Sequence, residues 1–129
     1  LQLDDLSPEE ALKEIIRVAI AYEAKNPHRQ MLWFQEASQN QGFYFQQSNV
    51  QSLHDRLLKV LDRGIKAGCF RPLDPFLTLT HILSVCIFYF TVHENWKHLN
   101  SQSDRLSQEM VKKHTEAAIE FILAAVKQN

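Results

Sequence analysis

Apolar residues recur every three or four positions along most of this chain, which is the spacing of one face of an α-helix. The first such run follows Ser7-Pro8-Glu9-Glu10, where Ser7 is placed to cap free backbone N–H groups and Pro8 stands where no N–H is needed. Asn26-Pro27 predicts the end of this helix, because proline disfavours helical geometry in the residue before it. Its apolar stripe consists of Leu12, Ile15, Ile16, Ala19 and Tyr22.

Two further helices are predicted before residue 68. A short one runs from about Pro27 to Gln39 and ends before Gly42, and a longer one runs from about Asn49 to Ala67. Gly64 lies beside the apolar stripe of the longer helix, where the missing side chain would let another helix approach closely. The stripe consists of Val50, Leu53, Leu57, Leu61 and Ile65.

The segment GCFRPLDP, residues 68 to 75, combines a helix stop with a helix start. Gly68 is suited to the left-handed conformation that closes a helix, and Pro72 prevents the helix from resuming. Asp74 is placed to cap the next helix, and Pro75 is suited to be its first residue.

The predicted fourth helix, from Pro75 to about His93, is apolar almost all round. A helix without a polar face in so small a protein needs cover on two sides, and the three preceding helices supply only one. After a polar loop at about 94–103, a fifth helix from about Asp104 to Lys127 carries apolar residues near heptad spacing. These residues are Leu106, Met110, Ala117, Phe121 and Ala124.

This pattern predicts an all-α domain of five helices that pairs with a second copy of itself. Two copies, each giving its last two long helices, would form a four-helix bundle between subunits. The residues predicted at the interface are Leu83, Phe90, Met110, His114, Ala117, Phe121 and Ala124.

Composition narrows the classes of function. The chain has 129 residues, about the size of one domain, and a net charge of −1, so it has no general attraction for nucleic acid or anionic lipid. The most apolar run, Ile82 to Val92, is shorter than the roughly 20 residues of a membrane span. The acidic start does not have the pattern of a signal peptide, and Cys69 and Cys86 form no C-x-x-C pair. We therefore expect one cytoplasmic domain, spanning residues 1–129, with no membrane contact.

Neither catalysis nor metal binding is predicted. The sequence contains no glycine-rich phosphate loop, no G-x-S-x-G and no H-E-x-x-H, so no catalytic residue is assigned. The six histidines form no metal signature: His93 and His98 are five apart across a predicted helix end, whereas His28 and His54 belong to different predicted helices. We expect neither a metal nor a cofactor.

Several segments resemble the C-terminal half of the TetR/AcrR family of bacterial transcription regulators, and together they cover essentially the whole chain. The most specific element is a helix that ends Gly-x-Phe-Arg before an Asp-Pro helix start. The matching segments are SPEEALKEIIRVAIAY, NPHRQMLWFQEASQNQGFYF, LHDRLLKVLDRGIKAGCFRPLDP and KKHTEAAIEFILAAV.

The resemblance implies that predicted helices one, three and four enclose a pocket for a small effector, and that the last two long helices pair in a homodimer. Such regulators, repressors among them, begin with a helix-turn-helix head, and this chain contains no such segment with basic recognition residues. DNA contact is therefore expected only through an N-terminal domain missing from this chain. LQLDDL, residues 1 to 6, would be the tail of the helix that joins the head to this domain. The effector would favour one arrangement of the dimer and so change the spacing of the DNA heads.

The candidate effector residues lie on apolar stripes or offer a polar group beside them, which favours a hydrophobic or aromatic effector. They are Tyr22, Trp33, Phe34, His54, Leu57, Leu61, Phe76, Ser84 and Tyr89. Ordinary core packing is the alternative for every one of them.

Two residues have both a regulatory and a structural interpretation. His114 lies in the seam of the last helix, where it is either a pH-sensitive interface group or a hydrogen-bonded interface histidine without a regulatory role. Cys69, near a predicted surface turn, is the better candidate for an oxidant sensor than Cys86, with an inert role as the alternative. For the whole chain, the rival to the regulator domain is a free-standing helical module that binds another protein and has no ligand pocket.

Overall fold

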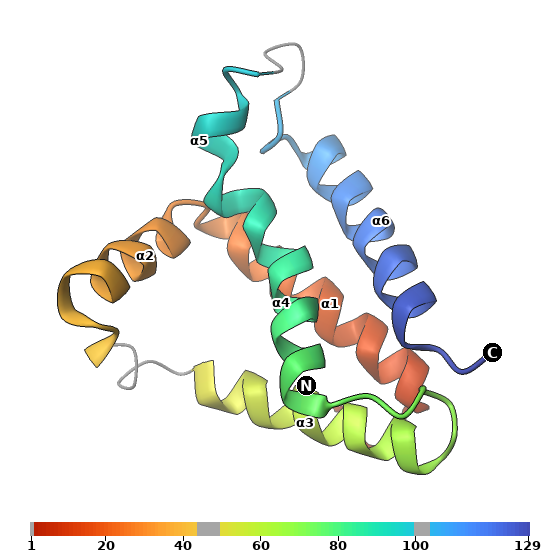
Figure 1. The fold of residues 1–129 in the computed structure, drawn as a ribbon. Helices are drawn as coiled ribbons and strands as arrows, with labels where there is room; N and C mark the ends of the chain where they lie inside the picture. The colour runs from red at the N-terminus through yellow and green to blue at the C-terminus, as the bar shows by residue number, and fades with distance from the viewer. Residues whose placement is uncertain (1, 44–49, 100–103) are drawn as a thin grey trace.

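The computed structural model describes residues 2–43, 50–99 and 104–129, and these residues form six helices (Figure 1). The helices are α1 (Pro8–Lys25), α2 (Arg29–Asn40), α3 (Val50–Lys66), α4 (Pro75–Thr91), α5 (His93–Trp96) and α6 (Gln108–Val126). The all-α prediction is confirmed, but the prediction of five helices omits α5. This single turn forms within the predicted polar loop because the Val92 carbonyl accepts hydrogen bonds from the N–H groups of Asn95 and Trp96.

Helix α1 is the centre of the packing, since it contacts α3, α4 and α6 (Figure 1). Of its predicted apolar stripe, Leu12, Ile15, Ile16 and Ala19 are buried, whereas Tyr22, in the last turns of the helix, is exposed because it lies beyond the residues that α3, α4 and α6 cover. Each fully buried leucine or isoleucine side chain contributes about 1.5–3 kcal/mol to stability when it leaves water. The other helices supply the rest of the core, including Leu57, Val60, Leu61, Leu79, Ile82, Cys86, Phe90, Ala118, Ile122 and Val126.

The helix ends follow local side-chain chemistry. The Ser7 hydroxyl accepts a hydrogen bond from the Glu10 N–H at 3.2 Å, and one Asp74 carboxylate oxygen accepts from the N–H groups of Phe76 and Leu77 at 2.9 and 3.0 Å. Gly68 has φ +79°, the left-handed conformation that closes α3. The stop and start predicted between residues 68 and 75 are therefore confirmed.

The atoms nearest to the missing side chain of Gly64 belong to the ring of Phe70, six residues further along the chain, between α3 and α4. A turn residue, and not the second helix that the sequence predicts, therefore makes the closest approach. A methyl group at position 64 would come within 2.1 Å of a carbon of that ring. The chain folds back tightly after α3, because the Gly64 carbonyl accepts hydrogen bonds from the N–H groups of both Cys69 and Phe70.

The segment between α3 and α4 is bonded to the C-terminal end of α6. Phe70 and Lys127 form an isolated antiparallel bridge, in which the Arg71 N–H donates to the Val126 carbonyl at 2.8 Å. The Arg71 guanidinium also donates to the Ala125 carbonyl. These bonds join two segments that are far apart in the sequence and fix the end of α6 against the rest of the fold.

Helix α2 differs from the other long helices because none of its residues is buried. It contacts α4 and lies to one side of the molecule, on the side opposite α6 (Figure 1). Polar contacts hold its first turn: Arg29 forms an ion pair with the buried Glu23 of α1, and the Gln30 amide donates to the same carboxylate oxygen at 3.0 Å. The Arg29 guanidinium also lies 3.8 Å from the centre of the Tyr22 ring. In the described part of the chain, no helix is both long enough and apolar enough to span a membrane.

Candidate functional site

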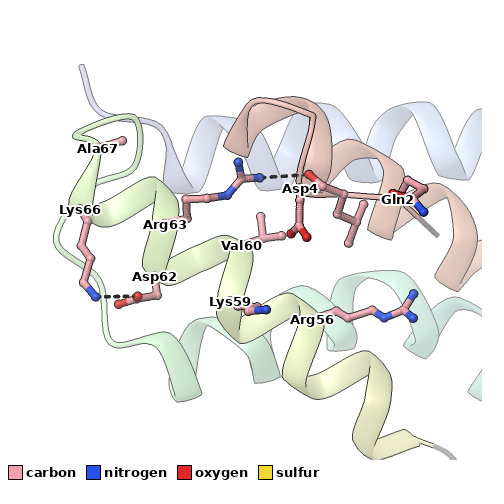
Figure 2. Close-up of a pocket in the computed structure, with 10 residues that line it drawn as sticks. Gln2, Asp4, Arg56, Lys59, Val60, Asp62, Arg63, Lys66 and Ala67 are labelled. Atoms are coloured by element: carbon pink, nitrogen blue, oxygen red, sulfur yellow. Dashed lines mark hydrogen bonds and ion pairs between the residues drawn. The ribbon is translucent and has the colours of Figure 1, made fainter.

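The larger of two cavities described here lies between the N-terminal segment and α3 (Figure 2). Its volume is about 740 Å³. Arg63 crosses from α3 to the N-terminal segment, where its guanidinium donates to the carbonyls of Leu6 and Leu3 at 2.8 and 3.3 Å. The lining is mostly charged, with Arg56, Lys59, Arg63, Lys66, Asp4 and Asp62 beside Gln2, Leu3, Val60 and Ala67. This surface suits polar or anionic groups better than the apolar effector predicted from the sequence.

The second cavity, of about 230 Å³, lies where the start of α2, α5 and the segment before α6 meet. The rings of His28 and His93 have their centroids 5.1 Å apart, so the structure brings together two histidines of different helices. Hydrogen bonding from Lys97 is the main cause that lowers the pKa of the Glu94 carboxyl group. The lining residues are His28, His93, Glu94, Lys97, Asp104, Arg105 and Leu106.

The nine candidate effector residues line neither of these cavities. Leu57 and Leu61 are fully buried core residues, whereas Phe76 is 71% exposed at the start of α4. Tyr22 and Phe34 are exposed, and Trp33, His54 and Tyr89 are half-buried. Ser84 is exposed, and its hydroxyl donates to the Thr80 carbonyl within α4 at 2.7 Å.

Tyr89 uses its polar group within the fold. Its hydroxyl donates to the Arg105 carbonyl at 2.6 Å, the Arg105 guanidinium donates to the Tyr89 carbonyl at 3.1 Å, and that guanidinium lies 4.0 Å from the ring centre. Burial raises the pKa of the Tyr89 hydroxyl, with Arg105 acting in the opposite direction. These contacts fasten the segment before α6 to α4.

His114 of α6 stacks on the Tyr89 ring, with the centroids 4.1 Å apart and the planes 10° from parallel. Its Nε2–H donates to the Cys86 carbonyl at 3.0 Å, since a carbonyl oxygen only accepts. Burial lowers the pKa of His114, and this effect outweighs the hydrogen bond to Cys86, which raises it. The imidazole thus faces α4 of its own chain and favours the neutral form.

The residues predicted for a dimer interface fall into three groups. Phe90 is fully buried in the core of its own chain and is not available to a partner. Leu83, Met110 and His114 are half-buried. On α6, by contrast, Phe121 is 65% exposed, and Ala117 and Ala124, which lie four residues before it and three residues after it, are exposed as well.

A second row of exposed residues lies on α4, which contacts α6 (Figure 1). Leu77, His81, Ser84 and Phe88 recur three or four residues apart, and all are exposed. The α6 residues Ala117, Phe121 and Ala124 together with the α4 residues Leu77, His81, Ser84 and Phe88 are called the α4/α6 surface below.

The two cysteines differ as the sequence predicted. Cys86 is buried, and burial raises the pKa of its thiol to about 12, so the reactive thiolate is scarce at neutral pH. Cys69 is exposed. The cavity residues Arg56, Lys59 and Arg63 lie at helical spacing on α3, and charges in such a pattern carry no sign of a cavity in the sequence.

Comparison with known proteins identifies a family. Residues 8–122 match the model of a protein family described as Tetracyclin repressor-like, C-terminal domain. This range includes all six helices in whole or in part, from the first residue of α1 into the last turns of α6. None of the curated proteins compared with the chain matches it.

Proposed function

The chain belongs to the family of tetracyclin repressor-like C-terminal domains, and from this premise we propose that it is the effector-binding, dimer-forming domain of a bacterial TetR-like transcription regulator. It acts in the cytoplasm, where a small molecule changes the DNA affinity of a helix-turn-helix head joined to its N-terminal side. The proposal assigns the domain no catalytic step and no part of the DNA contact.

The observation that carries the proposal is the α4/α6 surface. Phe121 on α6 is 65% exposed in one chain, and Leu77 and Phe88 on the contacting helix α4 are exposed as well. Large apolar side chains left exposed on a single chain are a common sign of a protein interface. A second copy of the chain would cover this surface with its own α4 and α6, since a two-fold interface uses the same residues on both partners. Phe90 lies outside the proposed interface because it is buried in its own chain.

The effector site is proposed beside α2. This helix has no buried residue, and its Phe34, together with Tyr22 at the end of α1, is exposed. Trp33, which directly precedes Phe34 in α2 and is half-buried, adds a third aromatic side chain. A hydrophobic or aromatic effector would cover these rings and favour one position of α2, because a ligand stabilises the conformation that it binds best. Leu57 and Leu61 support this site from the core rather than touching the effector.

Arg63 offers a connection from the effector domain to the head. It joins α3 to the carbonyls of Leu3 and Leu6, which precede α1. A shift of α3 would therefore move the N-terminal segment, and with it the head joined to that segment. In this proposal the charged cavity of Figure 2 is a contact region for the head rather than the effector site.

Native mass spectrometry of the purified 129-residue chain, followed by denaturation, tests the proposal. We expect a dimer that carries an added small molecule, lost on denaturation. The Phe34→Ala variant should remain dimeric but lose most of the added molecule. The Gln35→Ala variant, at the exposed neighbouring position, should remain dimeric and retain the added molecule. A monomer would contradict the dimer, and a ligand retained equally by both variants would contradict the site beside α2.

A further inference from the structure

We propose that His28, His93 and Glu94 together bind one divalent transition-metal ion, with zinc as the best match, at the junction of α2 and α5. This inference does not depend on the effector or on dimer formation. It arises because the fold brings a histidine before α2 into contact with a histidine and a carboxylate of α5, although the sequence shows no metal-binding motif.

The ligand atoms already lie close together. One ring nitrogen of each histidine and one carboxylate oxygen of Glu94 all fall within 4.8 Å of one another. Zinc in proteins usually takes four ligands, and its bonds to histidine nitrogen and carboxylate oxygen are about 2.0–2.2 Å long. Two histidines and a glutamate are a known zinc ligand set that leaves the fourth position to a water molecule.

His93 is held in the orientation that a metal ligand needs. Its Nδ1–H donates to the Phe90 carbonyl at 2.7 Å, which leaves the lone pair of a neutral ring on Nε2. A backbone carbonyl bonded to the other ring nitrogen is the usual way in which proteins orient a metal-binding histidine.

The surroundings of His93 Nε2 favour a positive charge beside this atom. The residue is 5% exposed, and Nε2 has no hydrogen-bond partner within the described residues. It lies 3.0 Å from Glu94 Oε1, so a neutral ring would place a lone pair against a carboxylate. A metal ion between the two atoms removes this repulsion. A second proton on His93 would do the same, and the experiment below separates the two.

His28 completes the set from the opposite side. It is exposed, it occupies the position before α2, and its side chain makes no capping hydrogen bond there. Its ring is tilted by 53° to that of His93, and it lines the same cavity. An exposed ring that caps nothing turns toward a metal at little cost.

The positive charges near the site set a limit on its affinity. Lys97 contacts the other Glu94 oxygen, Oε2, at 2.7 Å, which leaves Oε1 for the metal. Lys97 is half-exposed and turns readily to solvent. Arg105, the other cation of the cavity, is bonded to the Tyr89 carbonyl and packed on the Tyr89 ring. Removing the Lys97 charge should therefore strengthen metal binding.

A metal here would fasten the least buried helix to the core. His28 precedes α2, which has no buried residue, whereas His93 is bonded to the end of α4. Binding would thus restrict the start of α2 relative to α4 and α5, because a metal bound by the folded state alone stabilises that arrangement.

Titration calorimetry of zinc chloride into the EDTA-treated, dialysed 129-residue chain tests the site. We expect one zinc ion per chain and binding about tenfold or more weaker in His28→Ala and in Glu94→Gln. His98→Ala, which removes an exposed histidine outside the proposed ligand set, should bind as the wild type does, and Lys97→Gln should bind more tightly. Far-ultraviolet circular dichroism confirms that each variant is folded. The decisive variant is at His28 because this residue is exposed, whereas a substitution of the buried His93 would disturb the core.

Cobalt(II) provides a second readout, since four-coordinate ligation that includes two histidines and a carboxylate gives visible absorption far more intense than the weak absorption of hydrated cobalt. This intense absorption should appear in the wild type and in His98→Ala but be lost in His28→Ala. If zinc binds His28→Ala and His98→Ala equally, or does not bind the wild type, the metal site is wrong and a protonated His93 accounts for the contact with Glu94.

Discussion

Phe70 limits what can stand at position 64, because its buried ring occupies the space where any side chain of residue 64 would begin. We expect Gly64→Ala to lower the free energy of unfolding by roughly 1–3 kcal/mol, since overpacking a core outweighs the better helix propensity of alanine. Urea denaturation measures this change.

A double variant isolates the cause of that destabilisation. In a Phe70→Ala background all the side-chain atoms that would clash are gone, so adding Gly64→Ala should be neutral or stabilising. If Gly64→Ala costs as much there as in the wild type, contact with the ring is not the reason.

His114 makes the stability of the folded protein depend on pH. Burial keeps its pKa in the folded protein below the ordinary value of 6.5, so the unfolded chain binds the proton first as the pH falls. The contribution of His114 to stability is therefore complete above about pH 6.5 and is lost as the pH falls from there toward the folded pKa. The nearby charge of Arg105 acts in the same direction.

Urea denaturation at a series of pH values checks this prediction. The free energy of unfolding of the wild type should decrease more steeply below about pH 6.5 than that of His114→Gln, which does not titrate. Parallel pH profiles for the two proteins would contradict it.

At the scale of single elements, α4 depends on one carboxylate at its start. Asp74 accepts two hydrogen bonds from backbone N–H groups that have no partner within the helix. We expect Asp74→Ala to lower the free energy of unfolding by about 1 kcal/mol, measured in urea. Asp62→Ala is the matched control, since the one ion pair that Asp62 forms within the described residues, with Lys66, is exposed and its loss should cost about 0.5 kcal/mol or less. Equal effects would show that capping is not what Asp74 contributes.

Helix α2 shows how an element can be well predicted and yet poorly packed. Its helical pattern was recognised, and its observed bounds, Arg29–Asn40, lie close to the predicted ones. None of its residues is buried, although Trp33 and Phe34 are the kind of residues that fill cores. The proposed effector site and the proposed metal site both adjoin this helix, because an element without buried contacts is the easiest for a ligand to fix in place.

For the whole molecule, the α4/α6 surface makes the dimer testable. Phe121→Glu would place a carboxylate at the centre of the proposed interface, where burial of an unpaired charge is strongly unfavourable. We expect the variant to sediment as a folded monomer while the wild type sediments as a dimer. Gln108→Glu, at the exposed start of the same helix, makes the same change in charge and should remain dimeric. A dimeric Phe121→Glu would place the interface elsewhere.

The sequence predicted the helix ends best. The structure confirms the predicted roles of Ser7, Gly68, Asp74 and Pro75 at helix ends, which local sequence predicts because capping depends on bonds between residues at most a few positions apart. The candidate site was predicted less well. Leu57 and Phe76 both lie on apolar stripes, yet one is fully buried and the other is exposed.

The sequence alone therefore determined that this protein is all-α and where most of its helices begin and end. It also carries the resemblance to a regulator domain. Only the tertiary structure decided which apolar residues are covered, that the Phe70 ring fills the space beside Gly64, and that His28 meets His93 and Glu94. Helical spacing gives the face on which a side chain lies, but not what lies opposite that face. That depends on how helices distant in sequence pack together, because dispersion and burial act between whatever surfaces the fold brings into contact.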